Sequence, residues 1–247
     1  DLESQMIEAY KKGLEALEDG DVLYAAKNFN IVENLYPQSI WAPRSVLMAA
    51  YSFYSQDYYG DAISELKRFI KNYPENDNTP YAYFLLATCY YELIIDEKKD
   101  LSSIIKSKEY FNLIIEKYPN TDFALDAKFK LLLIDSILAS KEIYLGKYYL
   151  EKKKWISAMN RFKNVINDFE ETEYVEEAIH RLVEINYILG LEEEAKKYAI
   201  LLGYNYQSSQ WYKESYRVFN KKYENPKNKI KKEKGSKIIK KFKELFN

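Results

Sequence analysis

Small residues recur twelve positions apart along the chain, in pairs that stand among apolar residues at helical spacing. The pairs are Gly13 with Ala25, Ala50 with Ala62, and Gly146 with Ala158. In a hairpin of two antiparallel helices this distance brings the small residues face to face, so that the backbones approach closely. The apolar positions follow a three–four period without alternating runs, which predicts helices and no sheet.

The corners and helix ends keep the same register. A large apolar residue follows the second small residue by four positions, and Pro37, Pro74 and Pro119 end three of the units, because proline cannot continue a helix. A third unit pairs Ala87 with Ser107 across a corner eight residues longer, and a fifth unit is the weakest match. This unit of about 34 residues resembles the tetratricopeptide repeat.

The pattern predicts an all-α tetratricopeptide-repeat solenoid of about five helix hairpins. Helices are expected at Met6–Leu17, Val22–Leu35, Trp41–Tyr54 and Tyr59–Asn72. In the fourth unit, Thr121 to Glu151 predicts one elongated helix of about 45 Å at 1.5 Å per residue. We expect three parts: front repeats at 1–119, rear repeats with a short closing helix at 120–220, and a basic tail at 221–247.

Hydroxyl residues stand just before four of the predicted helices. They are Ser39, Thr79, Thr121 and Thr172. Each is expected to cap the helix that follows, because a side-chain oxygen can accept one of the first backbone N–H groups.

The first helices of the front hairpins carry many aromatic residues where such solenoids have their inner curve. With flanking positions, the set, called the front groove, is Tyr10, Tyr36, Arg44, Tyr51, Tyr54, Arg68, Tyr81, Phe84 and Tyr91. For any single member the alternative is packing between neighbouring hairpins. As a set they predict a tyrosine-rich binding surface with few charges.

Composition narrows the function classes. A hydrophobic content of 47% excludes a disordered chain, and no run approaches the roughly 18 apolar residues of a membrane span. Cys89 and His180 are the only residues of their types and are expected to pack in the interior. No phosphate-binding loop, nucleophile–base pair or metal motif is present in the sequence. The chain therefore predicts a binding protein, with no enzyme activity and no cofactor.

The tail differs from the body in charge. From Lys221 to Asn247 eleven lysines stand against three glutamates, a net charge of +8, whereas the whole chain carries −1. Most such runs are solvated, but the tail also has an apolar face flanked by lysines, which suits an anionic membrane surface or an acidic partner. Its candidate residues are Lys237, Ile238, Lys240, Lys241 and Phe242. Because the body is acidic, nucleic acid is not an expected partner.

Three stretches resemble the BamD family of outer-membrane assembly lipoproteins. Residues 146–169 contain the pair Tyr148–Tyr149, then Trp155, and the dipeptide Asn160–Arg161, all similar to the family's fourth repeat. Residues 61–92 are similar to its second and third repeats, including the step Arg68–Phe69–Ile70. The segment NYQSSQWYKESY resembles the ending of alphaproteobacterial members.

The resemblance implies a periplasmic scaffold of the outer-membrane protein assembly (BAM) complex. The scaffold is held at the outer membrane by an acylated N-terminal cysteine, which this chain lacks and which is expected upstream of Asp1. The front repeats would receive the aromatic C-terminal signal of unfolded β-barrel proteins. The rear repeats would dock on the last periplasmic domain of BamA through Arg161, Asn160 and Trp155. Other lipoproteins of the complex are further partners that the resemblance leaves open.

Two other function classes compete with this interpretation. One is another cell-envelope tetratricopeptide-repeat adaptor, such as a CpoB-like coordinator, which stable self-assembly through the first helices would favour. The other is an enzyme with an unrecognised site, which would need converging acid–base groups in a pocket. The assembly scaffold ranks first.

Overall fold

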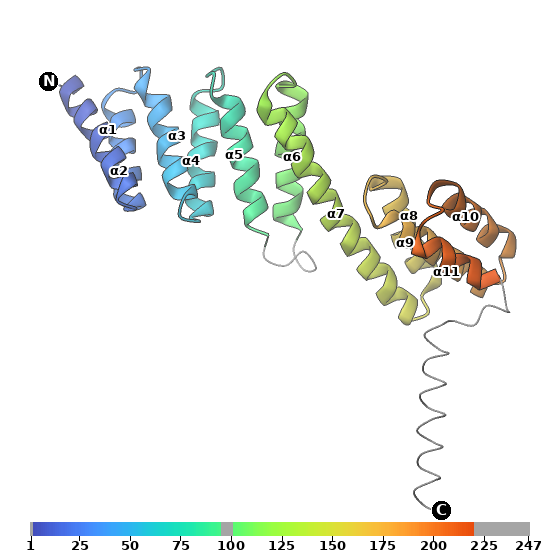
Figure 1. Ribbon diagram of the computed structural model, residues 1–247. Helices are drawn as coiled ribbons and strands as arrows, with labels where there is room; N and C mark the ends of the chain where they lie inside the picture. Colours follow the sequence, from blue (N-terminus) through green and yellow to red (C-terminus); the bar gives the residue numbers. More distant parts are fainter. Residues whose placement is uncertain (1, 95–100, 220–247) are drawn as a thin grey trace, which may run out of the picture. The chain divides into compact units, whose positions relative to one another are not determined.

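The computed structural model describes residues 2–94 and 101–219, and all regular elements within these ranges are α-helices (Figure 1). In chain order they are α1 (Leu2–Glu18), α2 (Val22–Leu35), α3 (Trp41–Tyr54), α4 (Tyr59–Asn72), α5 (Thr79–Glu92), α6 (Ser102–Lys117), α7 (Asp122–Glu151), α8 (Trp155–Asp168), α9 (Val175–Ile188), α10 (Glu192–Asn205) and α11 (Gln210–Phe219). Successive helices pair as hairpins. The predicted all-α fold of tetratricopeptide type is confirmed for the described residues.

The helices pack as two compact units, one up to Ile137 and one from Leu138 onward, and α7 contributes to both. In the first unit α1 to α6 stand side by side, and Figure 1 shows them in chain order. In the second unit α8 to α11 pack around α9. The predicted functional boundaries at 119 and 220 stay a prediction, because packing does not define them.

In two hairpins, packing explains why the first residue of the small pair is a glycine. A Cβ on Gly13 would lie 2.8 Å from the ring of Phe29, and one on Gly146 would lie 2.5 Å from the ring of Phe162. Both rings are fully buried. The predicted close approach of the two helices is therefore present. The backbone of each glycine faces an aromatic ring, and this ring belongs to the residue four positions after the small residue of the second helix.

Each of four hairpin corners contains one residue with positive φ. These are Gly20 at 81°, Asp57 at 63°, Lys153 at 56° and Gly190 at 76°. All four stand five positions before the small residue that opens the second helix of their hairpin. The corner is thus a repeated backbone conformation, which glycine adopts without strain and other residues adopt at a cost.

Two of the four predicted caps are correct. The hydroxyls of Ser39 and Thr121 accept hydrogen bonds from backbone N–H groups three residues later, at 3.2 and 3.3 Å. The prediction is wrong for Thr79 and Thr172, whose hydroxyls donate to backbone carbonyls six and three residues earlier, at 3.1 and 2.8 Å. These two side chains turn back to the end of the preceding helix, where each of the two carbonyls also accepts a backbone N–H.

The two residues expected to pack in the interior do so. Cys89 has no exposed surface, and burial raises the pKa of its thiol to about 12. His180 is 4% exposed. Across residues 2–94 and 101–219, no helix combines the length and the apolar character that a membrane span requires.

Candidate functional site

The front groove begins where α1 meets α3. The ring of Tyr10 is 9% exposed and packs edge-on against Phe29 and Trp41, at centroid distances of 5.4 and 5.1 Å. Arg44 is exposed, and its guanidinium carbon lies 5.8 Å from the ring centroid of Tyr10 and 5.6 Å from that of Trp41. Aromatic faces attract a cation through their quadrupole. At the α1 end of the front groove, Arg44 is therefore exposed while Tyr10 is largely buried.

Three tyrosines continue the groove along α3 and α5. Tyr51 is 42% exposed, while Tyr54 and Tyr81 are partly buried. Burial raises the pKa of Tyr81, and the nearby phenols of Tyr51 and Tyr54 raise it further. Tyr54 and Tyr81 pack against the same apolar cluster, and binding of one ligand by all three tyrosines stays a prediction.

The last groove residues on α5 are held against other helices. The ring of Phe84 lies 5.8 Å from that of Phe111 on α6 and 5.6 Å from that of Phe123 on α7. The Nζ atom of Lys130 lies 4.6 Å from the ring centroid of Tyr91. Packing thus accounts for much of the surface of Phe84, and a ligand contact by either residue stays a prediction.

Tyr36 and Arg68 stand apart from the first helices. Tyr36 follows the last turn of α2 and is 42% exposed. Arg68 on α4 pairs with Glu33 on α2 and with Glu65 on its own helix, and Glu33 is 6% exposed. The Arg68 guanidinium also donates to the Asn30 side chain at 2.6 Å. Arg68 therefore joins α2 to α4, and its predicted role toward a ligand is untested.

A small apolar pocket opens beside the start of the groove. It encloses about 310 Å³ and is lined by Met6, Ile7, Tyr10, Lys11, Leu14 and Trp41. Sequence reasoning included only Tyr10 among the candidate site residues. The spacing of Met6, Tyr10 and Leu14 along α1 was a usable signal, but it does not reveal that Trp41 closes the pocket from α3.

The predicted docking residues of the second unit lie on α8. Arg161 donates through Nη1 to both oxygens of Glu142 on α7, at 2.9 and 3.3 Å, and Asn164 donates to the same carboxylate at 3.0 Å. Asn160 is exposed, and Trp155 is partly buried against the apolar core of this unit. Sequence reasoning missed Glu142, although the register that opposes Gly146 to Ala158 also brings residue 142 close to residue 161.

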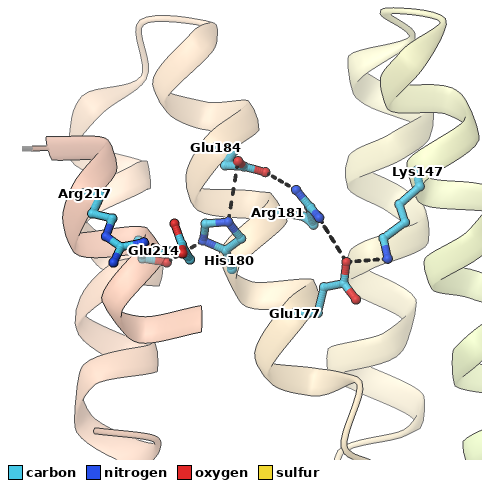
Figure 2. A network of polar contacts seen from close by, with 8 residues as sticks. Lys147, Glu177, His180, Arg181, Glu184, Glu214 and Arg217 are labelled. Carbon is cyan, nitrogen blue, oxygen red and sulfur yellow. Dashed lines mark hydrogen bonds and ion pairs between the residues drawn. The ribbon is translucent and has the colours of Figure 1, made fainter. Parts of the chain in front are cut away.

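Sequence reasoning also missed a partly buried polar network that joins α7, α9 and α11 (Figure 2). His180 contacts Ser215 Oγ through Nδ1 at 2.9 Å and Glu184 through Nε2 at 3.5 Å. Arg181 bridges Glu184 and Glu177, at 2.7 and 3.1 Å.

Two further contacts complete this part of the second unit. Lys147 of α7 pairs with Glu177 at 2.6 Å, which ties α7 to α9. The rings of His180 and Trp211 lie 5.2 Å apart. Ser215 has no exposed surface, so its contact with His180 joins α11 to α9 in the interior and presents no nucleophile at the surface.

The candidate residues of the basic tail lie outside the described residues. They are Lys237, Ile238, Lys240, Lys241 and Phe242, and their surface role stays a prediction. Within the described part of the chain, no group of three or more histidine, cysteine or carboxylate side chains could hold a metal ion.

Solved structures of tetratricopeptide-repeat proteins resemble this chain at low sequence identity. The TPR2AB domain of yeast Sti1 is 15% identical and covers 87% of this chain and 81% of its own, with a TM-score of 0.45. A likeness at this level carries no functional conclusion.

Comparison with curated proteins finds much closer similarity. The outer membrane protein assembly factor BamD of Caulobacter vibrioides is 37% identical over 211 residues, which are 85% of this chain and 69% of the relative. The protein of the same name from Rickettsia prowazekii is 39% identical over 225 residues, 91% of this chain and 89% of the relative. The family model described as YfiO, outer membrane lipoprotein, matches residues 2–201. The chain therefore belongs to the YfiO/BamD family of outer membrane lipoproteins.

Proposed function

We propose that this protein acts in the assembly of outer-membrane proteins, as a binding scaffold without catalysis. The observation that carries the proposal is its 37–39% identity, over 85–91% of the chain, to two proteins named as outer membrane assembly factors. We expect it to work at the periplasmic face of the outer membrane within the BAM complex, held there by a lipid anchor.

In this proposal the front groove binds the aromatic C-terminal signal of unfolded β-barrel proteins. The support is the row of tyrosines on α3 and α5, of which Tyr51 is 42% exposed. Tyrosine offers a large, rigid contact surface at a low cost in side-chain entropy. An extended segment with aromatic side chains would therefore find apolar contacts without requiring the helices to rearrange.

The second unit is proposed to dock on the periplasmic domain of BamA through the surface around Arg161. Among the described residues, Arg161 contacts Glu142 through Nη1 alone, so its Nη2 and Nε remain for a partner carboxylate. A guanidinium has five donors in a fixed plane, whereas a lysine ammonium is a single point charge. Arg161 can thus keep its contact with Glu142 while it binds a second acidic group.

The first test is binding of the purified protein to a labelled peptide that ends in an aromatic barrel-protein signal. Fluorescence anisotropy should show micromolar binding, and the peptide without its terminal aromatic should bind far more weakly. Changing Tyr51, Tyr54 and Tyr81 together to alanine should weaken binding and leave the helical circular dichroism spectrum unchanged. Equal binding of both peptides would contradict the proposed signal recognition. Stable self-assembly with no peptide binding would favour a CpoB-like coordinator.

A further inference from the structure

The pocket beside α1 combines an apolar interior with one cation in its lining, Lys11, and a second, Arg44, that lies against two of its aromatic residues. Its walls include the side chains of Met6, Leu14 and Trp41, and Lys11 lies at its lining. At about 310 Å³ it is at the small end of the range for ligand sites, which suits one large side chain rather than a whole peptide.

The cations at the pocket are not neutralised by the protein. Neither Lys11 nor Arg44 has an ion pair among residues 2–94 and 101–219. The neighbouring Lys12, in contrast, is paired with Glu8 at 2.7 Å. An apolar pocket beside two unpaired cations is complementary to a ligand that joins an apolar group to an anion.

The position of Arg44 favours a carboxylate as that anion. Its guanidinium lies over the rings of Tyr10 and Trp41, and both of these residues line the pocket. A guanidinium held against aromatic rings still has N–H donors for a ligand, in the fork that matches a carboxylate. The only residue of a protein chain that carries a side chain and a backbone carboxylate together is the last one.

We propose that this pocket binds the terminal residue of the incoming chain, taking its aromatic side chain into the apolar interior and its free α-carboxylate onto Arg44, with Lys11 adding charge. This inference rests on the proposed function and deepens it, because it assigns the chain end itself to the α1–α3 pocket and the residues before it to the tyrosines of α3 and α5. The protein then recognises the end of a chain and not merely an aromatic segment.

The test compares two labelled peptides that differ only in a C-terminal phenylalanine carboxylate or carboxamide, using the full chain and fluorescence anisotropy. The wild type should prefer the acid by about tenfold or more, since a charge-assisted hydrogen bond is lost with the amide. In Arg44→Gln most of this preference should be lost, with a small remainder from Lys11. Lys11→Gln should reduce it in part, and Lys12→Gln, whose lysine is paired with Glu8, should leave it unchanged.

The outcomes separate the two levels of the proposal. If the wild type binds neither peptide, the proposed signal binding fails and this inference with it. If it binds acid and amide equally, signal binding stands and the pocket assignment is overturned. An undiminished preference in Arg44→Gln would also overturn it, because the carboxylate would then be held elsewhere. Circular dichroism of each variant checks folding, and Arg44→Lys replaces Arg44→Gln if the latter unfolds, with a reduced preference expected.

Discussion

Lys153 shows how the repeat constrains a single residue. It stands at the same corner position as Gly20 and Gly190 and has a φ of 56°, where a side chain crowds the following carbonyl. Replacing Lys153 by glycine should therefore raise the free energy of unfolding by about 1 kcal/mol. Urea unfolding measures the change. The control is Lys152→Gly, whose φ is not positive, and it should not stabilise. A lower midpoint for Lys153→Gly would show that the corner tolerates lysine.

Gly146 is constrained by space rather than by φ. Because a Cβ there would meet the Phe162 ring at 2.5 Å, Gly146→Ala should lower the free energy of unfolding by about 1–3 kcal/mol. The added Phe162→Leu change should recover part of this loss. Gly60→Ala is the matched control, since a Cβ added there would have no heavy atom within 4 Å, and it should be neutral or slightly stabilising. Equal effects of both alanines would argue against the close packing. Thermal or urea unfolding distinguishes the cases.

At the scale of the helix, periodicity was a sufficient guide. The predicted ranges Val22–Leu35, Trp41–Tyr54 and Tyr59–Asn72 agree with α2, α3 and α4, and the elongated helix is α7. These boundaries follow from local signals, namely helical spacing, polar corners and prolines. The direction of a hydroxyl hydrogen bond does not, which is why the caps at Thr79 and Thr172 were wrong.

The stability of the second unit should depend on pH through Glu184 on α9. Burial alone would raise the pKa of Glu184, but the contacts with His180 and Arg181 outweigh it and lower the pKa below 4.5. A carboxylate with a lowered folded-state pKa stabilises the fold above its unfolded pKa, and this contribution disappears as pH falls through the folded value. Glu184→Gln should therefore be less stable than wild type at pH 7. The difference in unfolding free energy should shrink below about pH 4.5. A difference that stays constant from pH 7 to pH 3 would contradict this.

At the scale of the whole molecule, the structure changes the choice of variant for the BamA proposal. Arg161→Glu would place a second carboxylate beside Glu142 and could disturb the hairpin as well as the partner. Arg161→Gln avoids this repulsion and should weaken binding to the BamA periplasmic domain about tenfold or more, with the helical spectrum retained. Lys163→Gln changes an exposed cation on the same helix and serves as the control. Biolayer interferometry with immobilised BamA domain measures both. Undiminished binding of Arg161→Gln would count against docking there.

The sites were less predictable from sequence than the helices. Tyr51 was predicted from its register on the first helix of a hairpin and Arg161 from the family resemblance, and the binding role of each stays a prediction. The pocket closed by Trp41, the Arg161–Glu142 pair and the His180–Ser215 contact each join different helices, and the last spans 35 residues. A single helix pattern shows which face is apolar, but it does not show which partner residue meets a given side chain.

The buried state of Cys89 has a practical consequence for testing these surfaces. It is the only cysteine, it has no exposed surface, and burial raises its pKa to about 12, so very little thiolate forms near neutral pH in the folded protein. A cysteine introduced at Tyr51 or Lys11 would then be the sole reactive thiol of the native molecule. Maleimide probes and disulfide trapping could therefore report on the groove and the pocket separately, in a chain that keeps its natural core.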